Sequence, residues 1–372
     1  MQLTVLPSRD EMERAYQQRD ESYDGVFFLA VRTTGVFCRP SCTARKPHAE
    51  NVEFFPSARE AIFAGYRPCK RCRPLQIDGK PPEWAGRLLK MVEGEPTARY
   101  TDTLLRSEGF DPVRARRFFQ KQYGMTFQAY CRGRRLARSL EQIRLGKNLD
   151  DVALGYGFES HSGFRDAFVR TFGKSPGKSR SEDCIMATWI ESPLGPLIAG
   201  ATSEGICLLE FSDRRMLETQ FGKLRRYFKS AIVPGENAHL QQLREELKSY
   251  FAGTLKSFDV RLVVPGTPFQ MKVWQMLLTI PYATTVSYED IGRKIGAPNA
   301  QRAVGTANGM NRIAIVIPCH RVVNKDGDLG GYGGGLWRKR MLLQIEQGSP
   351  TNSGVKRVKG FRSDVTAIVT HA

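Results

Sequence analysis

At 372 residues the chain is long for one ordinary domain, and its length predicts two or three. Hydrophobic residues make up 41% and charged residues 25%, as in a globular protein, and no signal pattern or apolar run of about 18 residues predicts export or a membrane span. The formal net charge of +18 favours a polyanionic partner, with nucleic acid ahead of an anionic membrane. We therefore expect a cytoplasmic, nucleoid-associated protein with reduced cysteines.

Two close cysteine pairs mark the first predicted region, residues 1–78. The pairs Cys38-x3-Cys42 and Cys69-x2-Cys72 lie 26 residues apart, a spacing typical of a closed tetrahedral zinc site. A purely structural zinc ion is one alternative, and disulfides in a reducing compartment are another. A zinc-bound thiolate stays nucleophilic at neutral pH, so an alkyl acceptor is the third.

The residues around these cysteines are strongly basic, which predicts phosphate contacts. Alkylation of one thiolate would also remove a negative charge beside DNA and so strengthen binding. The candidate contact residues in this region are Thr34, Arg45, Lys70 and Arg71.

A basic helical block is predicted over residues 83–178, between linkers at 74–82 and 173–180. It reads as two helix-turn-helix units, with turns at 109–112 and 155–157 and with Ser160 capping a helix over 161–171. A basic solvated face on a helical bundle is the alternative. If the units bind DNA, the residues that face the groove or its phosphates are Arg114, Arg116, Arg117, Ser162 and Arg165.

The pattern changes after residue 185 to short strands joined by Pro-Gly and Glu-Gly turns. Helices are then predicted near 236–252, 268–280, 287–296, 299–310 and 337–347. The third and fourth of these form a further helix-turn-helix, with Arg302 at the start of its second helix.

Cys319 follows the apolar run 313–317, which we predict to be a buried strand, and directly precedes His320. An isolated cysteine in such a place commonly fills the core. A nucleophilic thiolate instead needs a base and a group that orients the base. His320 is the nearest base, acting through a water, and Glu346 on the last helix is the nearest orienting carboxylate.

Three stretches resemble known families. Residues 266–323, with the motif PCHRV, closely resemble the O6-alkylguanine-DNA alkyltransferases, and TTGVFCRPSC with GYRPCKRC resembles a methylphosphotriester domain. The helical block resembles AraC-type regulators. This order of domains is similar to that of the Ada family of bifunctional repair proteins and transcriptional activators.

The resemblance implies a role for each matched residue. Cys319 would accept the alkyl group from O6-alkylguanine or O4-methylthymine, and Cys38 would be both zinc ligand and acceptor from methylphosphotriesters. His320 would be the base, linked to the sulfur through a water, with Glu346 as its partner, and Asn311 would hold the turn that carries the cysteine. Tyr288 would donate a proton to the departing guanine, and Arg302 would fill the stack left by the flipped nucleotide.

The fold class implied is multidomain α+β. It comprises a zinc-bound α+β domain at 1–78, an all-α AraC-type double helix-turn-helix at 83–178, an alkyltransferase domain with a strand-rich half at 184–265 and a helical catalytic half at 266–348, and a tail at 349–372. One Zn²⁺ and no organic cofactor are expected. The expected partners of the monomeric chain are damaged and promoter double-stranded DNA and RNA polymerase, with no membrane.

Two other functions stay open at this stage. The chain is either a methylation-sensing transcription factor with a vestigial C-terminal site or a zinc-dependent DNA-binding scaffold without chemistry. One departure from the resemblance concerns residues 330 and 333–335, which are glycine where relatives commonly carry serine or larger residues. We therefore expect this loop to donate hydrogen bonds to a bound base only through its backbone N–H groups.

Overall fold

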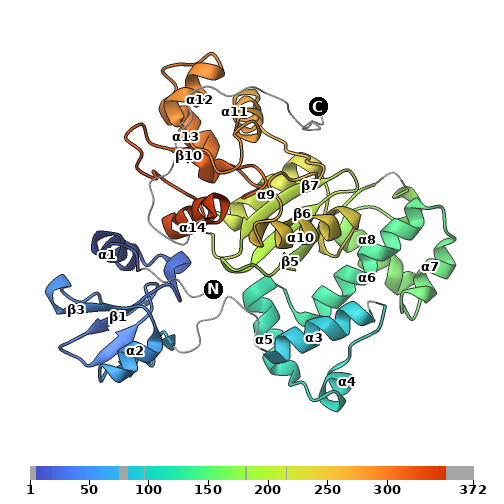
Figure 1. Ribbon diagram of the computed structural model, residues 1–372. Helices are drawn as coiled ribbons and strands as arrows, with labels where there is room; N and C mark the ends of the chain where they lie inside the picture. The colour runs from blue at the N-terminus through green and yellow to red at the C-terminus, as the bar shows by residue number, and fades with distance from the viewer. Residues whose placement is uncertain are drawn as a thin grey trace.

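The computed structural model describes residues 6–74, 83–95, 97–123, 125–180, 182–214 and 216–348. The predicted tail 349–372 and nearly all of the predicted linker 74–82 lie outside these residues. Figure 1 shows a small N-terminal sheet, a group of helices in the middle of the sequence, and a central sheet flanked by helices. The predicted multidomain α+β class is confirmed.

The N-terminal unit is a four-stranded sheet in the order β3-β1-β2-β4. Apolar residues of β1 and β2, such as Phe28 and Phe37, pack with Ala61 of α2 on one face of the sheet. The elements are α1 (Arg9–Gln18), β1 (Phe28–Val31), β2 (Val36–Cys38), β3 (Val52–Phe55), α2 (Ala58–Phe63) and β4 (Arg67–Pro68), with short 3₁₀ turns at Glu21–Tyr23 and Ala49–Asn51.

The middle unit is entirely helical and contains both predicted helix-turn-helix pairs, α4–α5 and α7–α8, joined by the long helix α6. Ser160 caps α8 as predicted, because its hydroxyl accepts a hydrogen bond from the Gly163 amide at 3.1 Å. The helices are α3 (Glu83–Gly94), α4 (Asp102–Ser107), α5 (Pro112–Tyr123), α6 (Phe127–Arg144), α7 (Leu149–Gly155) and α8 (His161–Phe172).

The strand-rich half that follows forms a second four-stranded sheet in the order β7-β6-β5-β8. Its elements are β5 (Ile185–Ile190), β6 (Leu197–Ala201), β7 (Ile206–Phe211), α9 (Leu217–Phe228), β8 (Ile232–Pro234) and α10 (Ala238–Phe251). Helix α9 was missing from the sequence prediction. The signal for it was present, because Leu217, Phe221, Leu224 and Phe228 recur at helical spacing and pack in one hydrophobic cluster.

The helical half contains α11 (Pro268–Leu278), β9 (Val286–Ser287), α12 (Tyr288–Lys294), α13 (Gln301–Gly309), β10 (Val322–Val323) and α14 (Leu336–Gln347). Capping boxes start two of these helices, Thr267 with Gln270 at α11 and Ser287 with Asp290 at α12. The third predicted helix-turn-helix is therefore present as α12–α13, and Arg302 is the second residue of α13.

The prediction of a strand over residues 313–317 is wrong. Ile313 makes a single bridge to Leu209 of β7, and residues 314–316 form turns, with Ile315 at a φ of +73°. All five side chains are nevertheless buried. A short apolar run indicates that a segment is buried but does not indicate its backbone conformation. Its pattern therefore cannot distinguish a strand from a buried turn.

The N-terminal unit packs directly on the last helix, and Figure 1 shows it beside α14. The Trp337 indole N–H donates to the Ser22 carbonyl at 2.5 Å, and Arg340 pairs with Glu11 at 2.6 Å. Phe27 of this unit is fully buried in the hydrophobic cluster of the alkyltransferase-like core. Within the described residues, no helix is both long and apolar enough to cross a bilayer.

Replacing Trp337 and Arg340 together with alanine should loosen this contact. We expect the free energy of local opening at residues 22–28 to fall by about 3 kcal/mol, since a buried Trp and an ion pair are lost. Faster hydrogen–deuterium exchange there, with unchanged exchange in β5–β7, is the expected result. Arg225→Ala, on the exposed side of α9, is the control. Equal exchange in both variants would contradict the contact.

Candidate functional site

The four cysteines of the N-terminal unit lie together because β2 and β4 are parallel neighbours. Phe37 pairs with Pro68, which places Cys38 at the end of β2 close to Cys69 just after β4. The Cys69 amide donates to the Phe37 carbonyl at 2.9 Å, and the Cys42 amide closes a turn on the Arg39 carbonyl at 3.1 Å. The first bond joins the two pairs, and the second folds Cys42 back toward Cys38.

The cluster fits one zinc ion. The four sulfur atoms all lie within 4.8 Å of one another. Four thiolates around Zn²⁺ with bonds of about 2.3 Å would be about 3.8 Å apart, so a small closure of the cluster completes a tetrahedron. The predicted cofactor is confirmed, and Cys38, Cys42, Cys69 and Cys72 are the residues that would hold it.

Asn311 fixes the turn that carries Cys319. Its side-chain amide donates to the Ile317 carbonyl at 2.9 Å and to the Cys319 sulfur at 3.1 Å, while its carbonyl oxygen accepts from the Ile313 amide at 3.0 Å. Cys319 then opens a 3₁₀ turn, Cys319–Arg321, and is 6% exposed. The sulfur therefore has an oriented N–H donor in a setting from which bulk water is excluded.

Glu346 is the acceptor for several buried groups beside this turn. The Nε2 atom of His320 lies 2.8 Å from the carboxylate, the Tyr250 hydroxyl donates at 2.8 Å, and the Arg321 guanidinium donates at 2.9–3.2 Å. The backbone N–H of Ala283 adds a fourth donor at 3.1 Å. This buried carboxylate is thus fully hydrogen-bonded.

The protonation states of the pair follow from this network. Burial opposes ionisation of Glu346, but His320 and Arg321 together hold its pKa well below the usual range. Burial also lowers the pKa of His320, so the ring is neutral. A carboxylate can only accept, so Nε2 of the ring carries the proton. The Nδ1 atom, buried and without a partner among the described residues, keeps a free lone pair.

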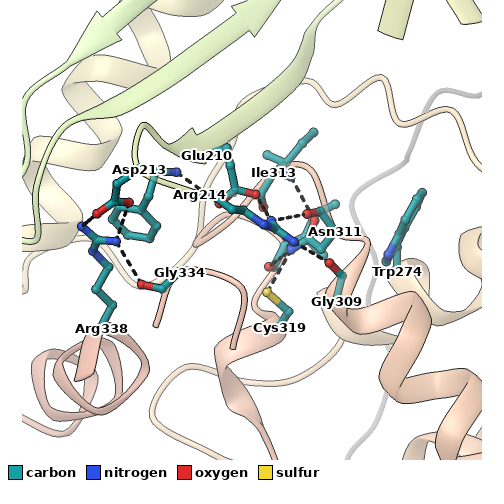
Figure 2. Close-up of polar contacts among 12 residues, drawn as sticks. Glu210, Asp213, Arg214, Trp274, Gly309, Asn311, Ile313, Cys319, Gly334 and Arg338 are labelled. Atoms are coloured by element: carbon teal, nitrogen blue, oxygen red, sulfur yellow. Dashed lines mark hydrogen bonds and ion pairs between the residues drawn. The ribbon is translucent and has the colours of Figure 1, made fainter. Parts of the chain in front are cut away.

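A pocket opens directly at the sulfur. Residues of α12, α13, the end of β7 and the glycine-rich loop enclose it, and Figure 2 shows several of them around Cys319. Burial raises the pKa of the Cys319 thiol, while Asn311, Arg214 and Lys339 act in the opposite direction. Burial also raises the pKa of Tyr288 on the pocket wall, so its hydroxyl keeps its proton at neutral pH.

Comparison with known proteins matches all four predicted parts to family models. The matches are "Metal binding domain of Ada" at residues 11–75, "Helix-turn-helix domain" at 104–182, and the ribonuclease-like and DNA-binding domains of "6-O-methylguanine DNA methyltransferase" at 185–264 and 268–348.

The chain is 35% identical over 350 residues to the bifunctional transcriptional activator/DNA repair enzyme Ada of Escherichia coli K12, covering 91% of this chain and 96% of the relative. The chain belongs to the Ada family. A methylated-DNA–protein-cysteine methyltransferase of Mycobacterium bovis is 48% identical over 159 residues, which cover 42% of this chain and 90% of that protein. The crystal structure of Mycobacterium tuberculosis OGT in complex with DNA is 41% identical, covers 44% of this chain and 93% of its own, and superposes with a TM-score of 0.39.

Membership of the Ada family confirms the resemblance found in the sequence. The structure pairs Asn311 with the Cys319 sulfur and His320 with Glu346, and it sets Tyr288 on the pocket wall. The predicted DNA-contact residues lie elsewhere, at the protein surface. All ten have exposed side chains: Thr34, Arg45, Lys70, Arg71, Arg114, Arg116, Arg117, Ser162, Arg165 and Arg302.

Several residues of the network were missing from the sequence prediction. Arg321 binds Glu346, and the buried Lys339 donates to the carbonyls of Val322, Leu329 and Gly331 and so holds the glycine-rich loop. The signal for Arg321 was its place inside the PCHRV motif. Tyr250 is 96 positions from Glu346, and no sequence signal joins them.

Replacing Glu346 with glutamine should destabilise the protein by about 3 kcal/mol, because Arg321 is then a buried cation without its counter-charge. Urea denaturation at pH 7 measures the loss. The folded-state pKa of Glu346 is depressed, so its contribution is fully present above the unfolded value of about 4.3 and is lost as the pH falls below it. The gap between the two proteins should therefore close in acid.

Glu245→Gln, on α10 with a side chain 71% exposed, is the matched control and should change stability little. A gap of equal size for the two variants would contradict the assignment of Glu346 as the centre of the network.

Proposed function

We propose that the chain repairs alkylated DNA by irreversible transfer of the alkyl group to its own cysteines, and that alkylation of one cysteine switches on transcription. The single observation that carries the first part is the Cys319 sulfur at the pocket, bound by Asn311 and directly followed by His320, whose ring is bound by Glu346. Within the Ada family the chain is thus a methylated-DNA–protein-cysteine methyltransferase.

The residues support a direct displacement. Glu346 holds the Nε2–H tautomer of His320, so Nδ1 can take the thiol proton of Cys319 through one water. The thiolate attacks the alkyl carbon; the S–C bond forms and the bond from carbon to O6 of guanine breaks. The electron pair leaves with guanine, and the Tyr288 hydroxyl supplies a proton to the departing base.

The target carbon of O6-alkylguanine or O4-methylthymine lies inside the duplex, so the nucleotide must leave the stack to reach the pocket. Arg302, exposed near the start of α13, is placed on the helix-turn-helix of this half to fill the space left behind. The product, an S-alkyl cysteine, has no acidic proton and no good leaving group. Each site therefore reacts once.

In the N-terminal unit, Cys38 would be the acceptor from methylphosphotriesters. Bound zinc would keep the four cysteine sulfurs deprotonated at neutral pH. The Cys38 sulfur forms the new bond to the methyl carbon, and the phosphodiester leaves as an anion. Loss of one negative charge among Arg45, Lys70 and Arg71 reduces repulsion of DNA and strengthens binding.

The partners follow from these two sites. We propose double-stranded DNA, both damaged and promoter, read by α4–α5 and α7–α8 through Arg114, Arg116, Arg117, Ser162 and Arg165. Solved structures of relatives include a methylated N-Ada/DNA complex and Ada in complex with DNA, which supports this proposal.

Activation of transcription adds RNA polymerase as a further partner, and we propose a monomer that acts in the cytoplasm at the nucleoid. We propose the domain boundaries that the sequence predicts, namely 1–78, 83–178, 184–265 and 266–348, followed by a tail at 349–372.

Peptide-resolved mass spectrometry tests the two acceptors. After incubation with duplex DNA that carries O6-methylguanine and methylphosphotriesters, the peptides with Cys319 and Cys38 should each gain one CH2, about 14 Da. Cys319→Ala should lose the first gain only. Cys207→Ala, in a fully buried position on β7, is the control and should keep both gains.

A mass gain at Cys38 with none at Cys319 would identify a methylation-sensing transcription factor with a vestigial repair site. No gain at either cysteine would leave a zinc-dependent scaffold and contradict the proposal.

Methylation of Cys38 should raise affinity for promoter DNA by about fivefold for each nearby phosphate, corresponding to about 1 kcal/mol of relieved repulsion. Binding isotherms of methylated and unmethylated protein at several salt concentrations measure this. The affinity of both forms should fall steeply with salt. Protein methylated only at Cys319 is the control and should bind as the unmodified protein does. Coincident isotherms for the two Cys38 states would contradict the switch.

A further inference from the structure

A buried ion pair lies at the rim of the Cys319 pocket. Glu210 is fully buried inside the otherwise apolar strand β7, and Arg214 follows four residues later and pairs with it. Glu210 also accepts from the backbone N–H of Phe211 at 3.1 Å. Both residues line the pocket together with Cys319. An acidic residue in such a strand is costly to bury, so the pair requires a specific role.

The guanidinium of Arg214 is fixed by the segment that carries the sulfur. Its Nη1 atom donates to the Asn311 carbonyl at 3.1 Å, and its Nη2 atom donates to the Gly309 carbonyl at the end of α13. Figure 2 shows this end of the side chain among Glu210, Gly309 and Asn311, on the side of the pocket that holds Cys319. Together with the Glu210 carboxylate, these carbonyls use three of the five N–H groups of Arg214.

The same guanidinium explains a glycine of the loop. A Cβ atom at position 333 would lie 2.6 Å from Cζ, 2.7 Å from Nη2 and 2.9 Å from Nε of Arg214. At position 331 of the same loop a Cβ would meet nothing within 4 Å. The space that a side chain at 333 would fill, on the wall of the pocket, is therefore taken by Arg214 from the other half of the domain.

We propose that Arg214 is a further residue of the alkyl-transfer site: from the position that a side chain at 333 would occupy, it turns a permanent positive charge and spare N–H donors toward the ionised Cys319 sulfur and the oxygen of the departing base. This inference rests on the proposed function of Cys319. The charge stabilises the thiolate before transfer and the guanine anion during it. Gly333 is glycine because the guanidinium stands there.

Other charged or titratable groups face the sulfur, and they do not replace Arg214. Tyr288 and Tyr332 are neutral, because burial raises both of their pKa values. Burial lowers the pKa of Lys339 to about 8, so its charge fades as the pH rises. His320 is neutral and Glu346 is matched by Arg321. Glu210 offsets part of the Arg214 charge through Nη1, whereas a Cβ at position 333 would lie nearest to Cζ, Nη2 and Nε.

Single-turnover transfer from duplex DNA with O6-methylguanine, measured at saturating DNA across a range of pH, tests this role. Arg214→Met should slow transfer at pH 7 by about tenfold and move the pH midpoint of the rate upward by about one unit, since a nearby cation that favours the thiolate is lost. Arg214→Lys keeps a charge and should restore much of the rate. Arg225→Met removes an exposed charge on α9 and should change neither value.

Two glycine variants test the same role without substituting Arg214 or Glu210. Gly333→Ala should slow transfer by displacing the guanidinium. Gly222→Ala, on the exposed side of α9 where a Cβ meets nothing within 4 Å, should transfer at the rate of the unaltered protein. Circular dichroism and thermal melting establish that each variant is folded.

If the unaltered protein transfers no alkyl group, the proposed function fails. If it transfers normally and Arg214→Met keeps its rate and pH midpoint, or Gly333→Ala and Gly222→Ala behave alike, the role of Arg214 is overturned while the proposed function stands.

Discussion

The alkyl-acceptor half is organised around one amide, the side chain of Asn311. The apolar run at 313–317 is too short and too irregular to form a strand, and Ile315 adopts a backbone conformation that β-branched residues avoid. Its buried carbonyls and amides therefore need partners from outside a sheet. Asn311 satisfies the Ile317 carbonyl, the Ile313 amide and the sulfur at once, and Leu209 of β7 supplies two more hydrogen bonds through its backbone. The position of Cys319 follows from this turn.

The turn also explains why the strand-rich half is required beside the helical half. Strand β7 contributes Leu209 to the turn, and the segment just after it contributes Arg214 to the pocket. Helix α10 contributes Tyr250 to the carboxylate of Glu346. Glu346 can remain ionised while fully buried because Arg321 supplies its counter-charge. His320 is consequently left neutral with one nitrogen free. A neutral base next to a buried thiol is the arrangement that permits deprotonation without stabilising a permanent ion pair.

Local features were predictable from the sequence, and contacts between distant segments were not. The spacing of Cys38, Cys42, Cys69 and Cys72 specified a metal cluster because each pair is closed by a short turn. Ser160 specified a helix start because capping is local. The pairing of Arg214 with the space above Gly333 joins residues more than a hundred positions apart, and the docking of Trp337 on Ser22 joins residues even further apart. The 313–317 run misled because burial on every side removes the alternation that identifies a strand.

The two proposed acceptors differ in where the charge of the sulfur is balanced, and this difference explains why one of them can signal. At Cys319 the neighbouring cations, Arg214 and Lys339, have buried side chains. Cys42 and Cys69 are partly exposed, and exposed Arg45, Lys70 and Arg71 lie beside the cluster. A change of one charge there falls within a Debye length, about 8 Å, of bound phosphates and is felt as a change in affinity. The same change at Cys319, inside the buried pocket, alters the fit of the base there and leaves the electrostatic potential at the protein surface almost unchanged. Repair and signalling therefore require two separate sulfurs, one in a closed pocket and one at a basic surface.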